Sequence, residues 1–366
     1  MRLVYLSPVP WATFAQRPQK FASWFHSRTD GEVLWVDPYP TRFPRLSDIG
    51  RFDSTKDPDG QVQPDWIRVI KPFSLPLEPL PGAGWANAIF WRPILDELAH
   101  FVKNHDALLV IGKPSLLALA VLHRLKDIPS VYDAMDDFPA FYKGLSRYAM
   151  AKREARLVRR VDSLWVTSTS LKQRWEGLHP SAHLVPNALD ASLMPTAKIK
   201  SIEPSTQIFG YVGTIAAWFD WEWIIALAKV RSDDVIRLIG PVFTPTPIDL
   251  PGNIEFLPEC HHEVALNAMR DFDVGLIPFI RNELTASVDP IKFYEYRALG
   301  LPVISTEFGE MAFRKHEVGT FISQTLHDIA SLAELALCIH DIPAKANEFA
   351  LRNSWEARFD ATKIFH

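Results

Sequence analysis

The chain has 366 residues. This exceeds the roughly 250–300 residues at which a single hydrophobic core stops growing, so we expect two domains. With 48% hydrophobic and 22% charged residues, the composition is that of an ordinary globular protein and excludes a disordered or repeat chain. The net charge of -4 argues against nucleic acid as the main partner, and the two cysteines, Cys260 and Cys338, fit neither a disulfide framework nor a CxxC metal site.

The N-terminal residues lack the long apolar segment and the cleavage site of a signal peptide. Nowhere does an apolar run reach the roughly 18 residues that a membrane-spanning helix needs. We therefore expect a cytoplasmic protein, attached at most peripherally to the inner face of a membrane.

Short apolar segments alternate with helical stretches through the first half of the chain. The expected strands are 2–7, 32–37, 107–112, 129–134 and 163–168. Near-continuous apolar strands that alternate with helices indicate a parallel sheet covered on both faces. The first half is therefore expected to be an α/β domain with a doubly wound sheet.

A second series of strands follows a polar, proline-containing segment near residues 190–206. These strands are 208–213, 235–240, 254–258, 273–278 and 302–306. We expect Rossmann-like domains at 1–190 and 191–345 and a helical segment at 346–366. Ligands of such domains bind beyond the carboxyl ends of the strands, here in a central cleft, so candidate residues should follow strands.

The segment TASVDPIKFYEYRALGLPVIST (285–306) places Lys292 in the first turn of an expected helix. Pro290 is favoured at the first helical position, which makes Asp289 or Ser287 the plausible N-cap. A lysine beside the positive end of a helix dipole is disfavoured by about 0.3–1 kcal/mol unless an anion lies nearby. A diphosphate resolves this conflict, because first-turn amides and an ammonium together form an anion site.

Glu295 shares a helix face with Lys292 through its i,i+3 spacing. It could accept hydrogen bonds from sugar hydroxyls such as those of a ribose. The alternative is that Lys292 pairs with Glu295 or Asp289 on a solvated face. Gly300 is expected to end this helix ahead of the next strand.

This segment, preceded by FDVGLIPF (272–279), resembles the donor-binding segment of GT-B glycosyltransferases of the family-4-like group, the group 1 glycosyl transferases. The resemblance covers the second domain, through GYVGTIAAWFDWEWI (210–224), RLIGP (237–241), VPNALD (185–190) and NSWEARF (353–359). It implies a GT-B architecture in which Lys292 binds the diphosphate and Glu295 the ribose of a nucleotide-diphospho-sugar. It also implies that Gly240 lies near the nucleotide, that the first domain binds the acceptor, and that the terminal helix crosses back to that domain.

One position departs from the pattern of the group. Many retaining members carry two glutamates eight residues apart; Glu295 matches the later one, but the earlier one falls on Ser287. Glu283 and Asp289 lie nearby, out of register. The identity of the sugar and the stereochemical outcome are therefore left open.

Two further groups of residues follow strands of the second domain. Gly213 and Thr214 come directly before a helical stretch, so backbone amides there could approach a phosphate, although most such glycines only make a turn. Phe279, with Arg281 and Asn282, is expected to form a wall of the donor site.

In the first domain, Asp133, Asp136 and Asp137 cluster at the end of the strand 129–134. An inverting transferase needs a general base for the acceptor hydroxyl, and clustered carboxylates raise one another's pKa. Members of the group often carry a histidine-aspartate pair here; alignment puts Met135 at the histidine, so Asp136 is the leading candidate and Asp137 the second. The alternative is that one of these acids caps the following segment.

Arg17 lies in a segment (7–25) that resembles the RPQ segment of many such transferases, where the loop faces the cleft. It could contact a phosphate or an acidic acceptor, as could Asp133, or it could be an ordinary surface arginine. Residues 143–160 hold seven Lys and Arg against the single Glu154. This basic segment is either a solvated helix face or a surface that attracts anionic lipid or a lipid-diphosphate acceptor.

The sequence therefore predicts a glycosyltransferase that moves a sugar from a nucleotide-diphospho-sugar to a saccharide or lipid-linked acceptor, in bacterial polysaccharide or glycoconjugate synthesis. We expect no metal or other cofactor, because helix amides and Lys292 can stabilise the leaving diphosphate. We expect no nucleic-acid partner. Two alternatives stay open: a sugar-nucleotide epimerase of GT-B architecture and a non-catalytic bilobal ligand-binding protein.

Overall fold

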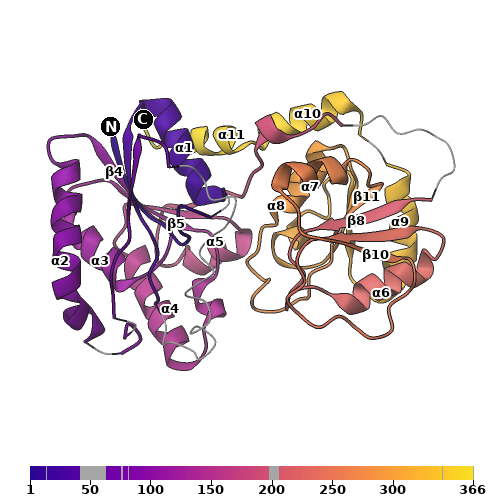
Figure 1. Cartoon of the computed structure of the whole chain (residues 1–366), viewed down its shortest axis with the longest axis horizontal. Helices are drawn as coiled ribbons and strands as arrows, with labels where there is room; N and C mark the ends of the chain where they lie inside the picture. The colour runs from indigo at the N-terminus through magenta and orange to yellow at the C-terminus, as the bar shows by residue number, and fades with distance from the viewer. Residues whose placement is uncertain are drawn as a thin grey trace. The chain divides into compact units, whose positions relative to one another are not determined.

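The computed structural model describes residues 1–13, 15–41, 63–75, 77–80, 82–197, 206–339 and 341–365. The chain divides into two compact units, Met1–Val185 and Pro186–His366. Each unit is a parallel β-sheet with helices packed on it (Figure 1). The fold predicted from the sequence, α/β with two doubly wound domains, is confirmed.

The sheet of the first unit has the strand order β3-β2-β1-β4-β5-β6-β7. Its strands are β1 (Arg2–Leu6), β2 (Glu32–Val36), β3 (Ile67–Ile70), β4 (Ala107–Ile111), β5 (Ser130–Ala134), β6 (Ser163–Val166) and β7 (Ala182–Leu184). The helices between them are α1 (Arg17–Thr29), α2 (Ala83–Val102), α3 (Leu116–Arg124), α4 (Gly144–Val158) and α5 (Thr169–Trp175), with a 3-10 turn, η2 (Phe138–Phe141), before α4. Alternate strand residues face opposite sides: Val4 packs in one core with α2 to α5, whereas Tyr5 packs on Phe21 of α1.

The second unit has the strand order β10-β9-β8-β11-β12-β13. Its strands are β8 (Ile208–Val212), β9 (Val235–Ile239), β10 (Ile254–Leu257), β11 (Val274–Ile277), β12 (Val303–Thr306) and β13 (Thr320–Ser323). Its α-helices are α6 (Trp221–Val230), α7 (His262–Met269), α8 (Ile291–Ala298), α9 (Ile329–Leu337), α10 (Pro343–Arg352) and α11 (Trp355–Asp360), and its 3-10 turns are η3 (Ala191–Leu193), η4 (Gly309–Phe313) and η5 (Leu326–Asp328). Because all described strands are parallel, their carboxyl ends share one edge of each sheet.

Three strands escaped the sequence analysis: β3, β7 and β13. All three are edge strands of three or four residues. An edge strand is half exposed and does not need the continuous apolar pattern of a central one. In β7, for example, Ala182 is only partly buried, and His183 and Leu184 are exposed.

The C-terminal segment, expected as one helix, is two. α10 ends at Arg352, and the Ser354 side chain then caps α11 by accepting a hydrogen bond from the amide of Ala357 at 3.1 Å. Between the two helices the chain pairs with Leu189: the Leu189 amide donates to Asn353 O and the Trp355 amide donates to Leu189 O. This pairing takes the backbone groups that a continuous helix would need, which explains the break.

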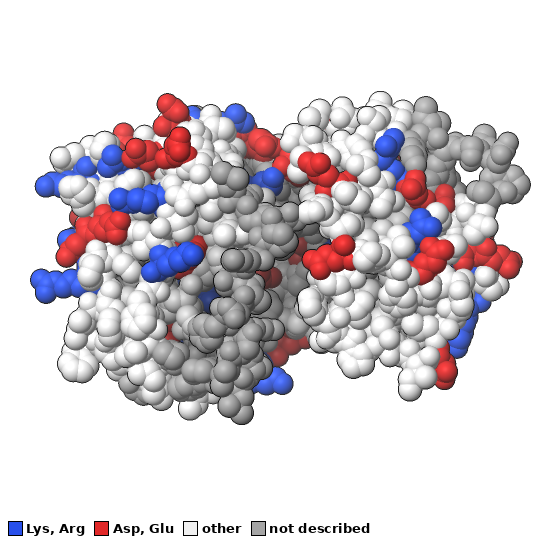
Figure 2. All heavy atoms as spheres, in the orientation of Figure 1, with Lys and Arg blue, Asp and Glu red and all other residues white. Residues whose placement is uncertain are grey.

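The surface carries both signs of charge. Figure 2 shows Lys and Arg interspersed with Asp and Glu over the visible face of both units, without a continuous basic stripe on that face. In the part of the chain that the structure describes, no helix combines the length and the apolar character needed to cross a bilayer.

Candidate active site

The helix that carries the main donor-site candidates begins at Ile291. Pro290 is in an extended conformation (φ −77°, ψ 122°) and is the residue before the helix, so the predictions that Pro290 is the first helical residue and that Asp289 or Ser287 caps it are wrong. The helix ends as predicted at Gly300, which has φ +77°. The Gly300 amide donates to Arg297 O and the Leu301 amide to Tyr296 O, the pair of bonds that defines a Schellman motif.

Lys292 lies against a pair of glycines at the carboxyl ends of β8 and β9. Gly213 and Gly240 both have φ of +137°, a conformation that side chains rarely adopt. A Cβ on Gly213 would come within 2.6 Å of the Lys292 Nζ, and a Cβ on Gly240 within 2.5 Å of the Gly213 carbonyl oxygen. The absence of a side chain at these two glycines therefore allows the two strand ends and the Lys292 side chain to pack closely together.

In the part of the chain that the structure describes, the ammonium group of Lys292 has no counter-ion. Among the described residues it makes neither a hydrogen bond nor an ion pair, so the surface pair with Glu295 or Asp289 does not form; its Nζ lies 5.5 Å from the centre of the Tyr211 ring. Burial lowers the pKa of Lys292, and the charge of Glu295 partly offsets this effect. A desolvated, unpaired ammonium at the N-terminal end of a helix is a site prepared for an anion.

Glu295 lies one turn further along α8 and is buried. Its Oε1 is 2.8 Å from Nε2 of His262, the first residue of α7, which is half exposed. The sequence analysis did not consider His262, because a residue 33 positions away in the chain gives no local signal. The carboxylate is thus held by a histidine at the surface, at the same edge of the sheet as the glycines.

The buried Asp289 holds the segment that leads into α8. Its carboxylate accepts hydrogen bonds from the Asn187 amide at 2.7 Å, the Tyr294 hydroxyl at 2.9 Å and Arg314 at 2.7 Å. Ser287, one turn of chain earlier, is buried as well. With its oxygens engaged in these contacts, Asp289 fixes the start of α8 from within the protein.

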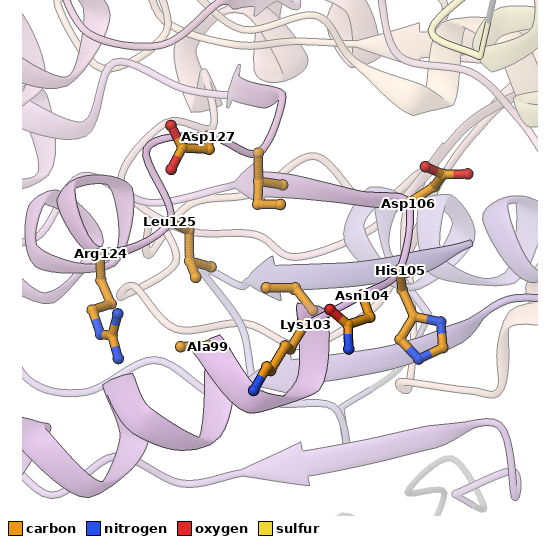
Figure 3. A pocket seen from close by; sticks show the side chains of 10 residues that line it. Ala99, Lys103, Asn104, His105, Asp106, Arg124, Leu125 and Asp127 are labelled. Atoms are coloured by element: carbon orange, nitrogen blue, oxygen red, sulfur yellow. The ribbon is translucent and has the colours of Figure 1, made fainter.

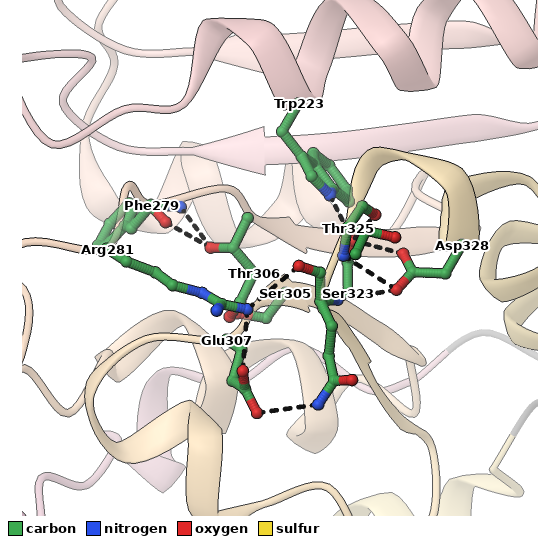
Figure 4. Close-up of polar contacts among 10 residues, drawn as sticks. Trp223, Phe279, Arg281, Ser305, Thr306, Glu307, Ser323, Thr325 and Asp328 are labelled. Carbon is green, nitrogen blue, oxygen red and sulfur yellow. Dashed lines mark hydrogen bonds and ion pairs between the residues drawn. The ribbon is translucent and has the colours of Figure 1, made fainter.

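The segments after β11, β12 and β13 are joined by polar contacts (Figure 4). The amide of Phe279 donates to Thr306 Oγ1 at 3.1 Å, and its ring packs against Phe308 and Tyr211, so Phe279 belongs to the core. Arg281, half exposed, pairs with Glu307 at 2.9 Å. Thr214 follows Gly213, and its carbonyl accepts a hydrogen bond from the Tyr211 hydroxyl at 2.8 Å.

In the first unit, the two residues expected to contact an acceptor or a phosphate contact each other instead. Arg17, in the first turn of α1, and Asp133, in β5, form a bidentate pair with both N–O distances at 2.8 Å. Their side chains are 3% and 1% exposed. The expectation that they reach a ligand is therefore wrong, because burial of a charge requires a partner and each is the partner of the other.

Asp136 follows β5 and is half buried. Its side chain has no hydrogen-bond partner among the described residues, whereas its neighbour Asp137 accepts a bond from Arg174 at 2.6 Å. Desolvation, together with the charge of Asp137, raises the pKa of Asp136 to about 7. Asp136 is thus an unpaired carboxylate that can exchange a proton near neutral pH, as a general base must.

Arg174 belongs to a network that the sequence analysis missed. It contacts Asp137 and also Glu154, which is fully buried and accepts a hydrogen bond from the Tyr132 hydroxyl at 2.8 Å. Burial raises the pKa of Glu154 to about 7. The network engages Asp137 and leaves Asp136 as the available acid of the cluster.

The basic segment 143–160 contains the whole of α4, and its charges do not all face solvent. Arg153 is buried against Glu78, with its Nε 3.6 Å from a Glu78 carboxylate oxygen, and it also donates to the Glu78 carbonyl. Lys143, Lys152, Arg156, Arg159 and Arg160 are exposed. Only this exposed part can meet a partner, and Arg153 serves the packing of the unit.

A shallow cavity of about 560 Å³ lies elsewhere on the first unit (Figure 3). It is lined by the end of α2 with Lys103, which follows it, and by Arg124 at the end of α3 with Asp127, which lies in the turn after it. These residues precede β4 and β5, so the cavity is at the edge of the sheet opposite to Asp136. In the described part of the chain, no group of three or more His, Cys, Asp or Glu is placed to hold a metal ion.

No family model matches this sequence. Among curated proteins, the chain is 25% identical over 245 residues to TuaH of Bacillus subtilis (strain 168), which is named as a glycosyltransferase of teichuronic acid biosynthesis. The match covers 60% of this chain and 61% of TuaH. The similarity thus spans less than two thirds of either protein.

Solved structures match over nearly the whole chain. Sucrose-phosphate synthase from Thermosynechococcus elongatus has a TM-score of 0.68 at 14% identity, covering 100% of this chain and 98% of that one. HepE from Anabaena, solved in complex with UDP, has a TM-score of 0.63 at 14% identity, covering 99% of both chains. The architecture shared with these proteins is the two-domain GT-B fold.

Proposed function

We propose that this chain, a protein of the GT-B fold, is a glycosyltransferase that moves a sugar from a nucleotide-diphospho-sugar to an acceptor hydroxyl. The observation that carries the proposal is the unpaired, desolvated ammonium of Lys292 against Gly213 and Gly240. Its surroundings match the needs of a diphosphate: a positive charge, the N-terminal end of a helix and close backbone approach. The name of TuaH and the UDP bound to HepE support the same reading.

The second unit would hold the donor. Lys292 and nearby backbone amides would bind the diphosphate, and they would stabilise the additional negative charge that it gains as it leaves the anomeric carbon. Glu295, which still has an oxygen beyond its contact with His262, would accept hydrogen bonds from the ribose. Because these groups supply the positive charge that the leaving group needs, we propose that the reaction requires no metal.

The first unit would hold the acceptor, with Asp136 as general base. In an inverting transfer the Asp136 carboxylate takes the proton of the acceptor hydroxyl, the oxygen bonds to the anomeric carbon, and the bond from that carbon to the diphosphate oxygen breaks. A pKa of about 7 suits this step, since a substantial share of the group is deprotonated at neutral pH and the carboxylate is basic enough to take a proton. Asp137, bonded to Arg174, would support the charge of the site.

The acceptor is proposed to be a saccharide or a lipid-linked saccharide in bacterial polysaccharide or glycoconjugate synthesis. The TuaH name supports this class. We further propose a cytoplasmic location with peripheral contact to an anionic membrane, where lipid-linked acceptors are found.

Calorimetry with a panel of nucleoside diphosphates tests the donor site. One diphosphate should bind, and Lys292→Ala should weaken it by about 10- to 100-fold, the value of a charge-assisted hydrogen bond of roughly 1.5–3 kcal/mol. Glu295→Ala should weaken binding of the diphosphate with its ribose but leave that of inorganic pyrophosphate unchanged. The exposed Lys229→Ala on α6 is the matched control. Binding that is equal in all four proteins would refute the site.

Product analysis tests the reaction. Transfer should persist in excess chelator, and a rate that collapses without added Mg²⁺ or Mn²⁺ would remove the metal-independent mechanism. Incubation of the donor without acceptor should leave the sugar configuration intact, whereas an altered sugar would identify an epimerase.

A further inference from the structure

The first unit exposes large apolar side chains at one end, and neither the donor site nor Asp136 accounts for them. On α2, Trp85 is 87% and Ile89 78% exposed, and on α4, Leu145 and Tyr148 are each 67% exposed. Phe73, after β3, packs edge to face against Phe90 of α2, with the ring centres 5.0 Å apart. A side chain of this size costs free energy when it faces water, so a cluster of them marks a surface that is covered in use.

These residues lie at the same end of the unit. Helices that connect parallel strands run antiparallel to them, so α2 and α4 both begin near the carboxyl ends of the strands. α3 packs against both helices and lies between them (Figure 1). Glu78, just before α2, accepts a hydrogen bond from the first amide of α3 and pairs with Arg153 in the middle of α4. These contacts tie the start of α2 to the start of α3 and to α4.

Each helix carries one exposed stripe that changes character along its length. On α2 the stripe runs from Trp85 and Ile89 to Arg92 and Asp96; on α4 it runs from Leu145 and Tyr148 to Lys152, Arg156 and Arg159. The first two turns are apolar and the later turns charged. An apolar first part followed by charged turns is typical of a helix whose N-terminal end inserts into a bilayer while its charged turns stay at the level of the lipid head groups.

The exposed charges within the two apolar segments, 71–95 and 138–153, have one sign. From Lys71 to Leu95 the single acid is Glu78, which is fully buried, and from Phe138 to Arg153 there is no acid at all. The exposed cations there are Lys71, Arg92, Lys143 and Lys152. A surface that binds a second copy of the chain does not require an excess of positive charge, whereas an anionic lipid surface attracts a surface with such an excess.

We infer that the ends of α2 and α4, with Phe73, form a docking surface for an anionic membrane. Trp85, Ile89, Leu145 and Tyr148 insert among the lipids, and Lys143, Lys152 and Arg156 bind their head groups. Membrane binding by this surface does not depend on the proposed function, but its purpose does. Asp136 lies a few residues before α4, so docking brings the proposed base to the depth at which the membrane presents a lipid-linked hydroxyl.

Sedimentation with vesicles tests the surface. The protein should bind phosphatidylcholine vesicles that contain about 30% phosphatidylglycerol and bind pure phosphatidylcholine weakly. Trp85→Ser with Ile89→Ser, or Leu145→Ser with Tyr148→Ser, should lower the partition coefficient at least about tenfold. Lys152→Glu with Arg156→Glu should lower it by about fivefold or more per charge on anionic vesicles only.

Phe243→Ser with Ile248→Ser is the matched control, since these residues of the second unit are 74% and 98% exposed. This control should bind vesicles like the wild type, and all variants should bind the nucleoside diphosphate normally, which shows that they fold. Vesicle binding that is absent in the wild type, or unchanged in the variants, would overturn the inference. So would a dimer in analytical ultracentrifugation that Trp85→Ser dissolves. Failure of diphosphate binding would instead count against the proposed function alone.

Discussion

Arg17 and Lys292 have similar positions in the two units and opposite surroundings. Each lies in the first turn of a helix that follows a central strand, and each is a cation where a helix dipole disfavours one. Arg17 is neutralised by Asp133, whereas Lys292 faces a glycine and an aromatic ring. The presence of a counter-ion therefore distinguishes the structural role from the ligand-binding role of a buried cation. A buried charge with a partner stabilises the fold, whereas a buried charge without one is available to bind a ligand.

The carboxylates divide in the same way. Asp133, Asp137 and Asp289 are each engaged by an arginine, while Asp136 has no partner in the described part of the chain. We therefore expect that substitution of a paired charged residue lowers the stability of the protein, and that substitution of an unpaired one lowers its ligand binding or catalytic activity.

The largest effect is expected from Asp136→Asn. Loss of a general base should lower kcat by about 10²–10⁴-fold, while the affinity for the nucleoside diphosphate stays unchanged. In the wild type, kcat/KM should rise with pH and level off above pH about 7, as the base loses its proton. Steady-state kinetics across pH check this, with Asp137→Asn as the comparison. A variant with normal kcat would remove Asp136 from the mechanism.

The same substitution should raise stability at alkaline pH. The folded pKa of Asp136 lies above the value of an unfolded aspartate, so between the two the folded state binds more protons and stability falls as pH rises. An asparagine at position 136 carries no charge, so it removes the free-energy cost of burying an ionised carboxylate. Thermal unfolding should therefore show a higher Tm for Asp136→Asn at pH 8 and no gain at pH 4. A lower Tm at pH 8 would contradict the raised pKa.

Arg17→Ala tests the paired side of the comparison. Because it leaves Asp133 buried without a partner, it should lower the free energy of unfolding by about 3–5 kcal/mol. A double change to apolar residues, Arg17→Met with Asp133→Leu, should recover much of that loss. Chemical denaturation followed by circular dichroism measures both, and nucleoside diphosphate affinity should not change. A stable Arg17→Ala protein with impaired acceptor kinetics would give Arg17 a ligand role after all.

The smallest effect is expected from His262→Ala. Glu295 is paired with a half-exposed histidine, an intermediate case, so loss of His262 should raise the donor KM only about two- to fivefold and leave kcat unchanged. His262→Gln, which keeps a donor, should restore KM, and the exposed His327→Ala serves as the control. A fall in kcat without a change in KM would show that His262 acts on the reaction itself.

The sequence was sufficient for the fold because central parallel strands are continuous apolar runs, and a run of this kind is visible without any partner. It also selected Lys292, since a lysine in a first helical turn is a local anomaly. The pairing of Arg17 with Asp133 joins residues 116 positions apart, and that of His262 with Glu295 joins residues 33 apart. No local pattern encodes such pairs, which is why Arg17 was expected at a ligand and His262 was overlooked.

Phe279 shows a second limit. A residue just after a strand can turn toward solvent or back into the core, and the choice depends on Thr306, which bonds to the Phe279 backbone from the neighbouring strand. The N-cap of α8 was misjudged for a similar reason. Asp289 is a residue type that often caps helices, but its carboxylate oxygens accept hydrogen bonds from Arg314 and Tyr294 instead.

Lys292 has a further consequence as a reactive group. Because burial lowers its pKa, a larger share of its amine is uncharged at neutral pH than in an ordinary lysine. An uncharged amine is a nucleophile, and a phosphate-bearing aldehyde such as pyridoxal phosphate can condense with it, forming an imine and releasing water. The feature that prepares this position for a diphosphate therefore also makes it an attachment point for covalent inhibitors, and bound nucleotide would block their access to the amine.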